Sequence, residues 1–147
     1  MTEVVELGDV RIGFRNFEGR EGQYNRKGER SFAVFLPHDI AERMAADGWN
    51  VKFPEVHEDD DFAREPYMNV SLTFDKFPPK VVLFSNGVAT RLTAEEVPML
   101  DWAEITKCDL VIRPYEWSVN KSHGVKAYLK AGYFTIDTDS FSSKYGI

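Results

Sequence analysis

Apolar and polar residues alternate over several short stretches of the chain, and this pattern predicts a mainly β protein. The clearest case is Tyr67–Asp75, where hydrophobic side chains at every second position share one face and polar ones the other: Met68, Val70, Leu72 and Phe74 against Asn69, Ser71 and Thr73. The same reasoning predicts further short strands at Val10–Arg15 (with Val10, Ile12 and Phe14 on one face), Ser31–Leu36, Trp49–Phe53, Lys80–Ser85 and Val88–Leu92.

Residues typical of turns and helix caps lie between these predicted strands. Asn86–Gly87 is typical of a two-residue turn between paired strands, and Pro37–Ala46 has the apolar stripe of a short helix ended by Gly48. Thr93 and Glu96 have the spacing of a capping box that opens a second short helix, with Pro98 making it irregular or delaying its start. About seven short strands and two short helices therefore predict a β-barrel or sandwich with helical insertions.

A long hairpin is expected between Leu110 and Ile136, folded at the break Asn120–Gly124. Residues two apart on a strand share a face, so one face would carry three rings and three cations at Arg113, Tyr115, Trp117, Lys126, Tyr128 and Lys130. Rings stack on bases while cations meet phosphates, which suits a single-stranded nucleic acid. The alternative is that Tyr115 and Trp117 belong to the core. Strand parity also predicts a bulge near Ala131–Gly132.

A second basic and aromatic segment surrounds the glycine-containing loop Glu18–Arg30. Its candidate DNA-contacting residues are Arg15, Phe17, Tyr24, Arg26, Lys27 and Arg30. A basic hairpin of this kind beside a barrel can clamp a strand of nucleic acid. The competing interpretation is a solvated loop with Phe17 tucked into the barrel.

The charge distribution supports these two segments. The 147-residue chain has a net charge of −6, yet residues 11–30 and 110–135 each carry a balance of +3, leaving −12 for the rest. The local field at a site matters more for phosphate binding than the total charge. The chain has the length of one domain.

The sequence gives little sign of a membrane segment, a disulfide, a metal site or a catalytic motif. The chain has one cysteine, no run of 18 apolar residues and no signal-peptide pattern at its start, so a cytoplasmic setting is expected. Phosphate-loop, nucleophile-elbow and zinc-protease motifs are absent from the sequence, so we expect no catalytic residues, no metal and no cofactor. The acidic segment Glu55–Asp61 lacks the order of a calcium loop and is interpreted as solvated. Trp49 and Trp102 are expected in the core.

At these residues the chain resembles the bacteriophage single-stranded DNA-binding proteins of the OB-fold type. The matching pieces follow in the same order between about residues 14 and 136: Asn16-Phe17 with Gly19, Tyr24-Asn25, Gly28-Glu29-Arg30 with Phe32, Asp47-Gly48-Trp49-Asn50-Val51-Lys52, Arg113-Pro114-Tyr115-Glu116-Trp117 and Gly124-Val125-Lys126-Ala127-Tyr128-Leu129-Lys130. The resemblance implies a barrel that coats exposed DNA strands during phage replication or recombination without cleaving them. Many such proteins end in a strongly acidic tail that recruits replication partners, whereas the end of this chain has only Asp137 and Asp139.

The sequence therefore predicts a mainly β, OB-fold-like five-stranded barrel with an extra hairpin and two short helices over residues 1–136, followed by a short tail at 137–147. The expected function is sequence-independent single-stranded DNA binding, in the host cytoplasm if the protein is phage-encoded. Replication or recombination proteins are candidate partners, no membrane is involved, and a homo-oligomer stays open. The alternatives are a protein-interaction module without nucleic acid and, less favoured, a nuclease using metal at the acidic segment.

Overall fold

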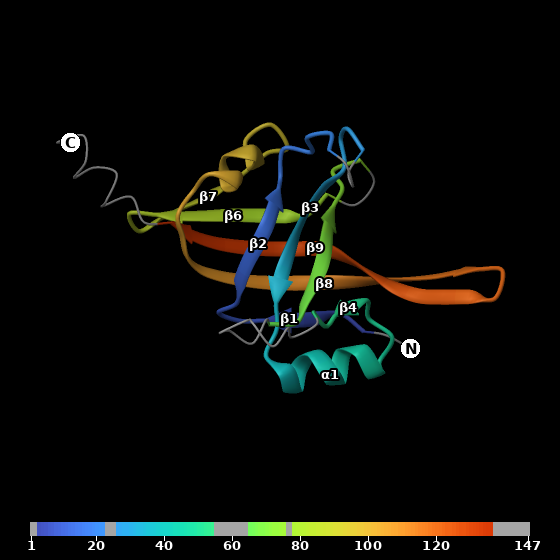
Figure 1. The fold of residues 1–147 in the computed structure, drawn as a ribbon. Coiled ribbons are helices and arrows are strands. Elements are labelled where there is room, and N and C mark those ends of the chain that lie inside the picture. Colours follow the sequence, from blue (N-terminus) through green and yellow to red (C-terminus); the bar gives the residue numbers. More distant parts are fainter. Residues whose placement is uncertain (1–2, 23–25, 55–64, 76–77, 137–147) are drawn as a thin grey trace, which may run out of the picture.

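The structure is a computed structural model that describes residues 3–22, 26–54, 65–75 and 78–136. These residues form nine strands, one α-helix and one 3-10 helix (Figure 1). In chain order they are β1 Val5–Leu7, β2 Arg11–Asn16, β3 Arg30–Phe35, α1 His38–Ala46, β4 Val51–Lys52, β5 Tyr67–Leu72, β6 Lys80–Ser85, β7 Val88–Arg91, η1 Val97–Asp101, β8 Ile105–Val119 and β9 Ser122–Ile136.

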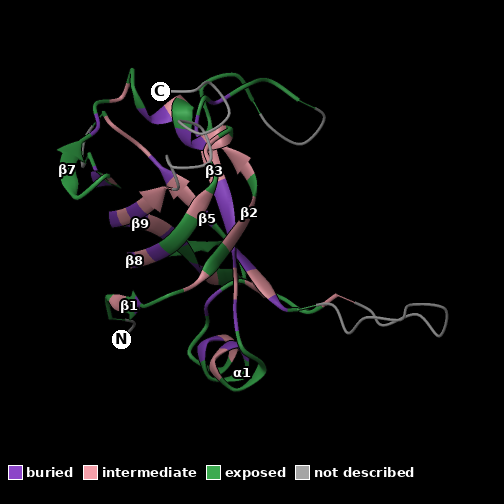
Figure 2. Cartoon of the chain, turned by 90° about the vertical axis from the view of Figure 1, so that its left-hand side faces the viewer, coloured by how far each residue is buried: buried purple, intermediate pink, exposed green. Residues whose placement is uncertain are grey.

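Five of the strands make a barrel in the order β2-β3-β5-β9-β8. Neighbouring strands are antiparallel except β5 and β9, which run parallel through the pairs Val70–Ala127 and Ser71–Tyr128. The barrel nearly closes where the Val10 N–H donates to the Cys108 carbonyl at 2.9 Å. Strands β2, β3 and β5 cross in front of β8 and β9 at a steep angle (Figure 1), and the view from the side places the two groups in opposite layers (Figure 2). A five-stranded, partly open barrel is the OB architecture, so the predicted fold is confirmed.

The remaining elements extend this barrel. β1 pairs with β8, β4 pairs with β5, and the β6–β7 hairpin joins the sheet through the parallel pairing of β6 with β9. The turn at Asn86 and Gly87 has φ of 51° and 76°, as a two-residue hairpin turn requires, so the predicted extra hairpin is confirmed. None of the helices in the described residues is long and apolar enough to cross a membrane.

The two predicted helices have different outcomes. α1 lies where expected, with Ala41 and Met44 buried. The second forms only the short 3-10 helix η1, with Pro98 in its first turn, where proline has no N–H to donate to the preceding turn. The capping contact is nevertheless present, since the Thr93 N–H donates to Glu96 Oε1 at 2.9 Å. This hydrogen bond lowers the pKa of the Glu96 carboxyl.

Three phenylalanines stack at the centre of the barrel core. The ring of Phe17 lies 5.1 Å from Phe32 in a stacked arrangement and 5.8 Å from Phe134 in an edge-to-face one. All three side chains are fully buried. Trp49 is also buried, as predicted, whereas Trp102 is 76% exposed at the end of η1, so its expected place in the core is wrong.

The long hairpin has a shorter turn than the sequence suggested. The turn consists of Asn120 and Lys121, and β9 already begins at Ser122 within the expected break. Asn120 adopts a φ of 57°, which Asn tolerates better than most residues and which permits this tight turn. The end of the hairpin projects beyond the barrel (Figure 1).

Cys108 is a buried thiol in β8, and burial, with a smaller effect of Asp109, raises its pKa to about 12. The reactive thiolate is therefore scarce at pH 8. We expect a disulfide exchange reagent to leave the native protein unlabelled at pH 8 over minutes and to label one thiol at once in denaturant. Cys108→Ser would supply the background signal, and rapid labelling of the native protein would contradict this placement.

Candidate nucleic-acid interface

The hairpin brings the predicted rings and cations onto one face. Arg113 pairs with Tyr128, Tyr115 with Lys126 and Trp117 with Gly124 across the antiparallel ladder. Directly opposed residues point to the same side of a sheet, so the shared face predicted from spacing is confirmed. Tyr115 and Trp117 are 54% and 39% exposed, which excludes the alternative that they belong to the core.

Tyr128 is the centre of this face. The Arg113 guanidinium carbon and the Lys126 ammonium nitrogen each lie 5.1 Å from the centroid of its ring. The Tyr115 ring stands edge-on to it, with centroids 6.0 Å apart. Two positive charges thus lie against the half-buried ring of Tyr128, and the neighbouring ring of Tyr115 is exposed.

Gly124 and Lys130 lie toward the two ends of the hairpin face that carries Tyr128. A Cβ at Gly124 would lie 3.0 Å from the Trp117 ring, so glycine lets the indole lie close to β9. Lys130 is the extra residue of a bulge, because Ile112 pairs with Leu129 and Val111 with Ala131. The bulge lies one residue before its predicted position and leaves Lys130 exposed.

The loop between β2 and β3 is fixed to η1 by a buried carboxylate. The Asp101 side chain is 1% exposed and accepts the N–H groups of Phe17 at 2.7 Å and Glu18 at 3.1 Å. Arg15 adds two hydrogen bonds from Nη1, to the carbonyls of Leu100 and Ala103. The guanidinium of Arg15 is therefore engaged with η1 rather than directed to the hairpin face.

The other predicted residues of this loop separate into three groups. Phe17 is fully buried, so its expected role as an exposed stacking ring is corrected to a core role, as its competing interpretation had it. Arg30 donates from Nη1 to the Ala94 carbonyl at 2.6 Å and lies 5.1 Å from the Phe74 ring centroid. Arg26 and Lys27 are exposed, and Tyr24 lies outside the described residues.

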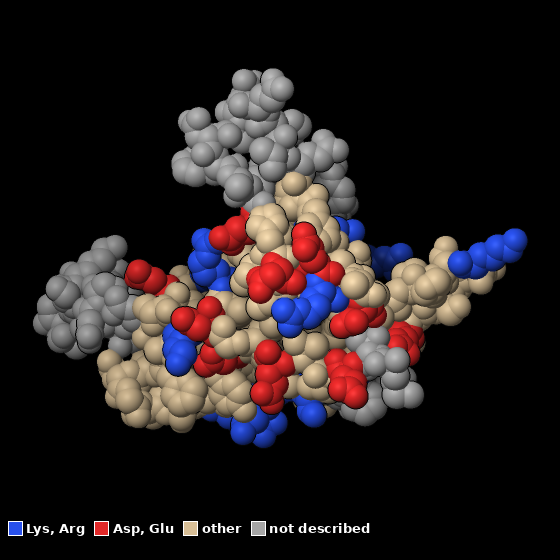
Figure 3. All heavy atoms as spheres, turned by 90° about the horizontal axis from the view of Figure 1, so that it is seen from below, with Lys and Arg blue, Asp and Glu red and all other residues tan. Residues whose placement is uncertain are grey.

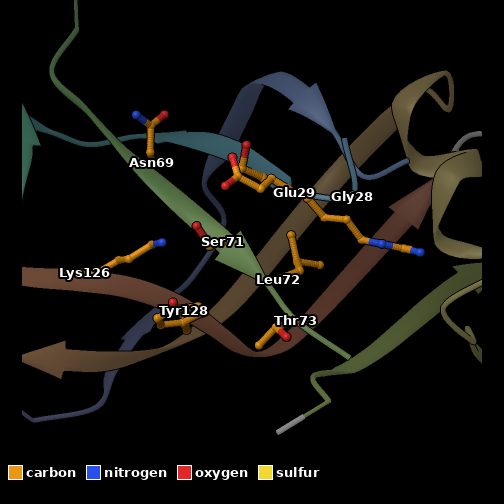
Figure 4. Close-up of a pocket in the computed structure, with 10 residues that line it drawn as sticks. Gly28, Glu29, Asn69, Ser71, Leu72, Thr73, Lys126 and Tyr128 are labelled. Carbon is orange, nitrogen blue, oxygen red and sulfur yellow. The ribbon is translucent and has the colours of Figure 1, made fainter. Parts of the chain in front are cut away.

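A groove joins this loop to the hairpin (Figure 4). Its volume is about 510 Å³, and it is lined by Gly28–Ser31, by polar residues of the β5 segment and by β9: Asn69, Ser71, Thr73, Lys126 and Tyr128. Figure 4 shows the ammonium of Lys126 and the ring of Tyr128 on one side, opposite Glu29 across β5. The polar face of β5 lines the groove, but it was not among the candidate DNA-contacting residues predicted from the sequence. The alternation that creates this face was visible in the sequence.

Negative charge gathers on another side of the molecule. Figure 3 shows Asp and Glu side chains, with some Lys and Arg among them, spread over the face on which α1 lies, where Asp39, Glu42 and Asp47 are exposed. The projecting end of the hairpin carries Lys or Arg instead (Figure 3). The face around α1 is therefore richer in acidic side chains than the end of the hairpin.

Among the described residues, no group of three or more His, Cys, Asp or Glu is placed to hold a metal ion. The acidic segment 55–61 and the tail 137–147 lie outside those residues.

Comparison with known proteins identifies the class. Residues 1–147 match the family model described as a putative phage ssDNA-binding domain, and the chain belongs to this family. No curated protein matched the chain in sequence.

Among solved structures, the chain is similar to the single-stranded DNA-binding protein from bacteriophage Enc34. The C-terminally truncated form aligns with a TM-score of 0.60 at 13% identity, covering 92% of this chain and 86% of that one. The same phage protein in complex with ssDNA gives a TM-score of 0.60 at 13% identity, with coverages of 92% and 87%. At this identity the likeness establishes a shared fold.

Proposed function

We propose that this protein binds single-stranded DNA without reading its sequence, through the groove and the adjoining face of the β8–β9 hairpin. The observation that carries the proposal is the placement of Arg113 and Lys126 against the Tyr128 ring at the edge of the groove. Every base has a π-face, so stacking on aromatic rings tolerates any sequence, while cations contact the backbone phosphates.

The position of the groove supports this function. OB folds bind oligonucleotides on the face of their second and third strands and with the loops that follow their first and fourth strands. Here those strands are β3 and β5, and the two loops are the β2–β3 loop and the end of the β8–β9 hairpin. The groove lies where the β2–β3 loop, β5 and β9 meet.

Membership of the phage family supports a role in coating exposed strands during phage DNA replication or recombination. The family supports binding of single-stranded DNA, and we assign no catalytic step to the protein. As part of the same proposal, replication or recombination proteins and a second copy of the chain are candidate partners.

The first test is a fluorescence titration of a labelled oligo-dT of about 30 nucleotides at 50 and 200 mM salt, against a duplex of the same length. We expect tight, salt-sensitive binding to the single strand and weak binding to the duplex. Three phosphate contacts, by Arg113, Lys126 and Lys130, would give a logarithmic salt slope of about −2, at ~0.7 per contact. No binding at low salt would overturn the proposal and favour a protein-interaction module.

The same titration with Lys126→Ala isolates one contact. The slope should become shallower by about 0.7. Arg43→Ala is the matched control, because Arg43 is an exposed cation in the last turn of α1, and its slope should equal that of the unmodified protein. An unchanged slope for Lys126→Ala would remove this residue from the interface.

A further inference from the structure

Phe14 is an exposed ring in a backbone conformation that phenylalanine rarely adopts. It lies within β2, has a φ of 46° and is 71% exposed. The pairing of β2 with β3 shifts register between Gly13 and Asn16, so Phe14 sits at a bulge. Strand parity predicted that Phe14 shares a face with Val10 and Ile12, which are half-buried, whereas at the bulge its side chain is exposed. Strained positions of this kind concentrate at functional sites.

Two more rings meet Phe14 on the outer side of the barrel. Its centroid lies 5.6 Å from Tyr67 of β5 and 6.3 Å from Phe35 of β3. Gly13 makes this arrangement possible, because a Cβ there would lie 2.8 Å from the Phe35 ring. Three adjacent strands therefore contribute one ring each to a cluster, which we call the Phe14 cluster: the exposed Phe14 and the half-buried Phe35 and Tyr67.

Cations accompany these rings. The Arg11 guanidinium carbon lies 5.6 Å from the Phe35 centroid, and Arg11 also pairs with the Glu65 carboxylate. Lys52 is exposed and pairs with Tyr67 across the β4–β5 ladder, which places it on the same side of the sheet. The cluster thus combines rings with cations, of which Arg11 is paired with a carboxylate and Lys52 is exposed.

The cluster adjoins the groove along one outward-facing row of β5. Tyr67 begins the row along β5, and Asn69, Ser71 and Thr73 follow it at every second position into the groove. Six residues of extended chain span about 20 Å. The neighbouring strand β3 runs the same course from Phe35 to Ser31, which also lines the groove.

We infer that the Phe14 cluster is a second stacking site for bases of the same single strand, which runs along β5 from the groove to Phe14. This inference rests on the proposed function and extends it, because it gives the strand a direction across the barrel. Phe14 offers an exposed π-face, and the polar residues between the two stacking sites offer hydrogen bonds to the strand that passes over them.

The test compares Phe14→Gly with the unmodified protein in titrations of labelled oligo-dT of about 30 nucleotides. Glycine adopts a φ of 46° without strain, so the variant should fold with an unchanged or higher melting temperature. The lost stacking should weaken binding by between about 5-fold and 150-fold. Phe84→Ala is the control, since Phe84 is an exposed ring of β6 stacked on Tyr133, and its affinity should stay within about twofold of the unmodified protein.

A second measurement on the unmodified protein keeps the inference testable if Phe14→Gly folds poorly. Photocrosslinking to an oligonucleotide that carries 5-iodouracil should modify the peptides containing Phe14 or Tyr67. Equal affinity of a folded Phe14→Gly variant, or crosslinks confined to the groove and hairpin, would overturn the second stacking site while leaving the proposed function intact. Absence of binding by the unmodified protein would instead overturn the proposed function itself.

Discussion

Replacing Phe17 by alanine is expected to destabilise the folded protein by about 3–5 kcal/mol, the cost of deleting a buried aromatic side chain. Phe17 is fully buried and contacts the rings of Phe32 and Phe134, so its removal leaves a cavity between them. The measurement is urea denaturation followed by circular dichroism. The midpoint should fall strongly, and any fraction that remains folded should bind oligo-dT as the unmodified protein does.

Two variants test whether this effect comes from packing. Phe17→Leu keeps most of the buried volume and should cost clearly less than Phe17→Ala. Tyr115→Ala removes a ring that is 54% exposed, and its stability should stay within about 0.5 kcal/mol of the unmodified protein. If Phe17→Ala instead kept full stability and lost affinity for DNA, Phe17 would be an interface residue after all.

The position of Phe17 shows that sequence alternation does not predict which side chains of the β2 segment are buried. Alternation predicted Phe14 on the same face as Val10 and Ile12, and the rings and cations of this segment made Phe17 a candidate DNA-contacting residue. The bulge after Gly13 reverses both expectations, because it shifts the side-chain parity of the strand by one residue. Nothing in the alternation itself marks the bulge, and the buried Asp101 that fixes Phe17 comes from 84 residues away.

The hairpin was predictable because its face depends on local spacing alone. The core positions Val125, Ala127 and Leu129 are buried as the period of two requires, which leaves Lys126 and Tyr128 outside. Its turn was less predictable, since Asn120 and Lys121 close it in two residues although the expected break ran from Asn120 to Gly124. Trp102 was placed in the core because of its apolar neighbours, but the shortened helix η1 ends there and leaves the indole at the surface.

The groove depends on a long-range pairing that no local pattern reveals. The sequence shows that Asn69, Ser71 and Thr73 share a polar face, but not what that face adjoins. The parallel pairing of Ser71 with Tyr128 joins segments 57 residues apart and turns the polar face into one wall of a site. The two basic segments could therefore be named from the sequence, whereas the surface between them could not.

Tyr128→Ala is expected to weaken binding of oligo-dT by between about 5-fold and 150-fold, the range for loss of one stacked base. The Tyr128 ring also holds Arg113 and Lys126 at 5.1 Å each, so its removal loosens two cations as well. Tyr128→Phe keeps the ring and should bind within about twofold of the unmodified protein. Titrations at one salt concentration, together with melting curves, separate affinity from stability.

Tyr133→Ala is the most stringent control, because Tyr133 resembles Tyr128 in strand, burial and the presence of a nearby cation but lies elsewhere along β9. It lies on the same strand, is also half-buried and has Lys80 Nζ 5.9 Å from its ring centroid, but it adjoins β6 rather than the groove. A strand of DNA that follows β5 does not contact Tyr133, so Tyr133→Ala should bind oligo-dT with the affinity of the unmodified protein. Equal losses for Tyr128→Ala and Tyr133→Ala would mean that the DNA follows β9 across the barrel, and the path along β5 to Phe14 would be wrong.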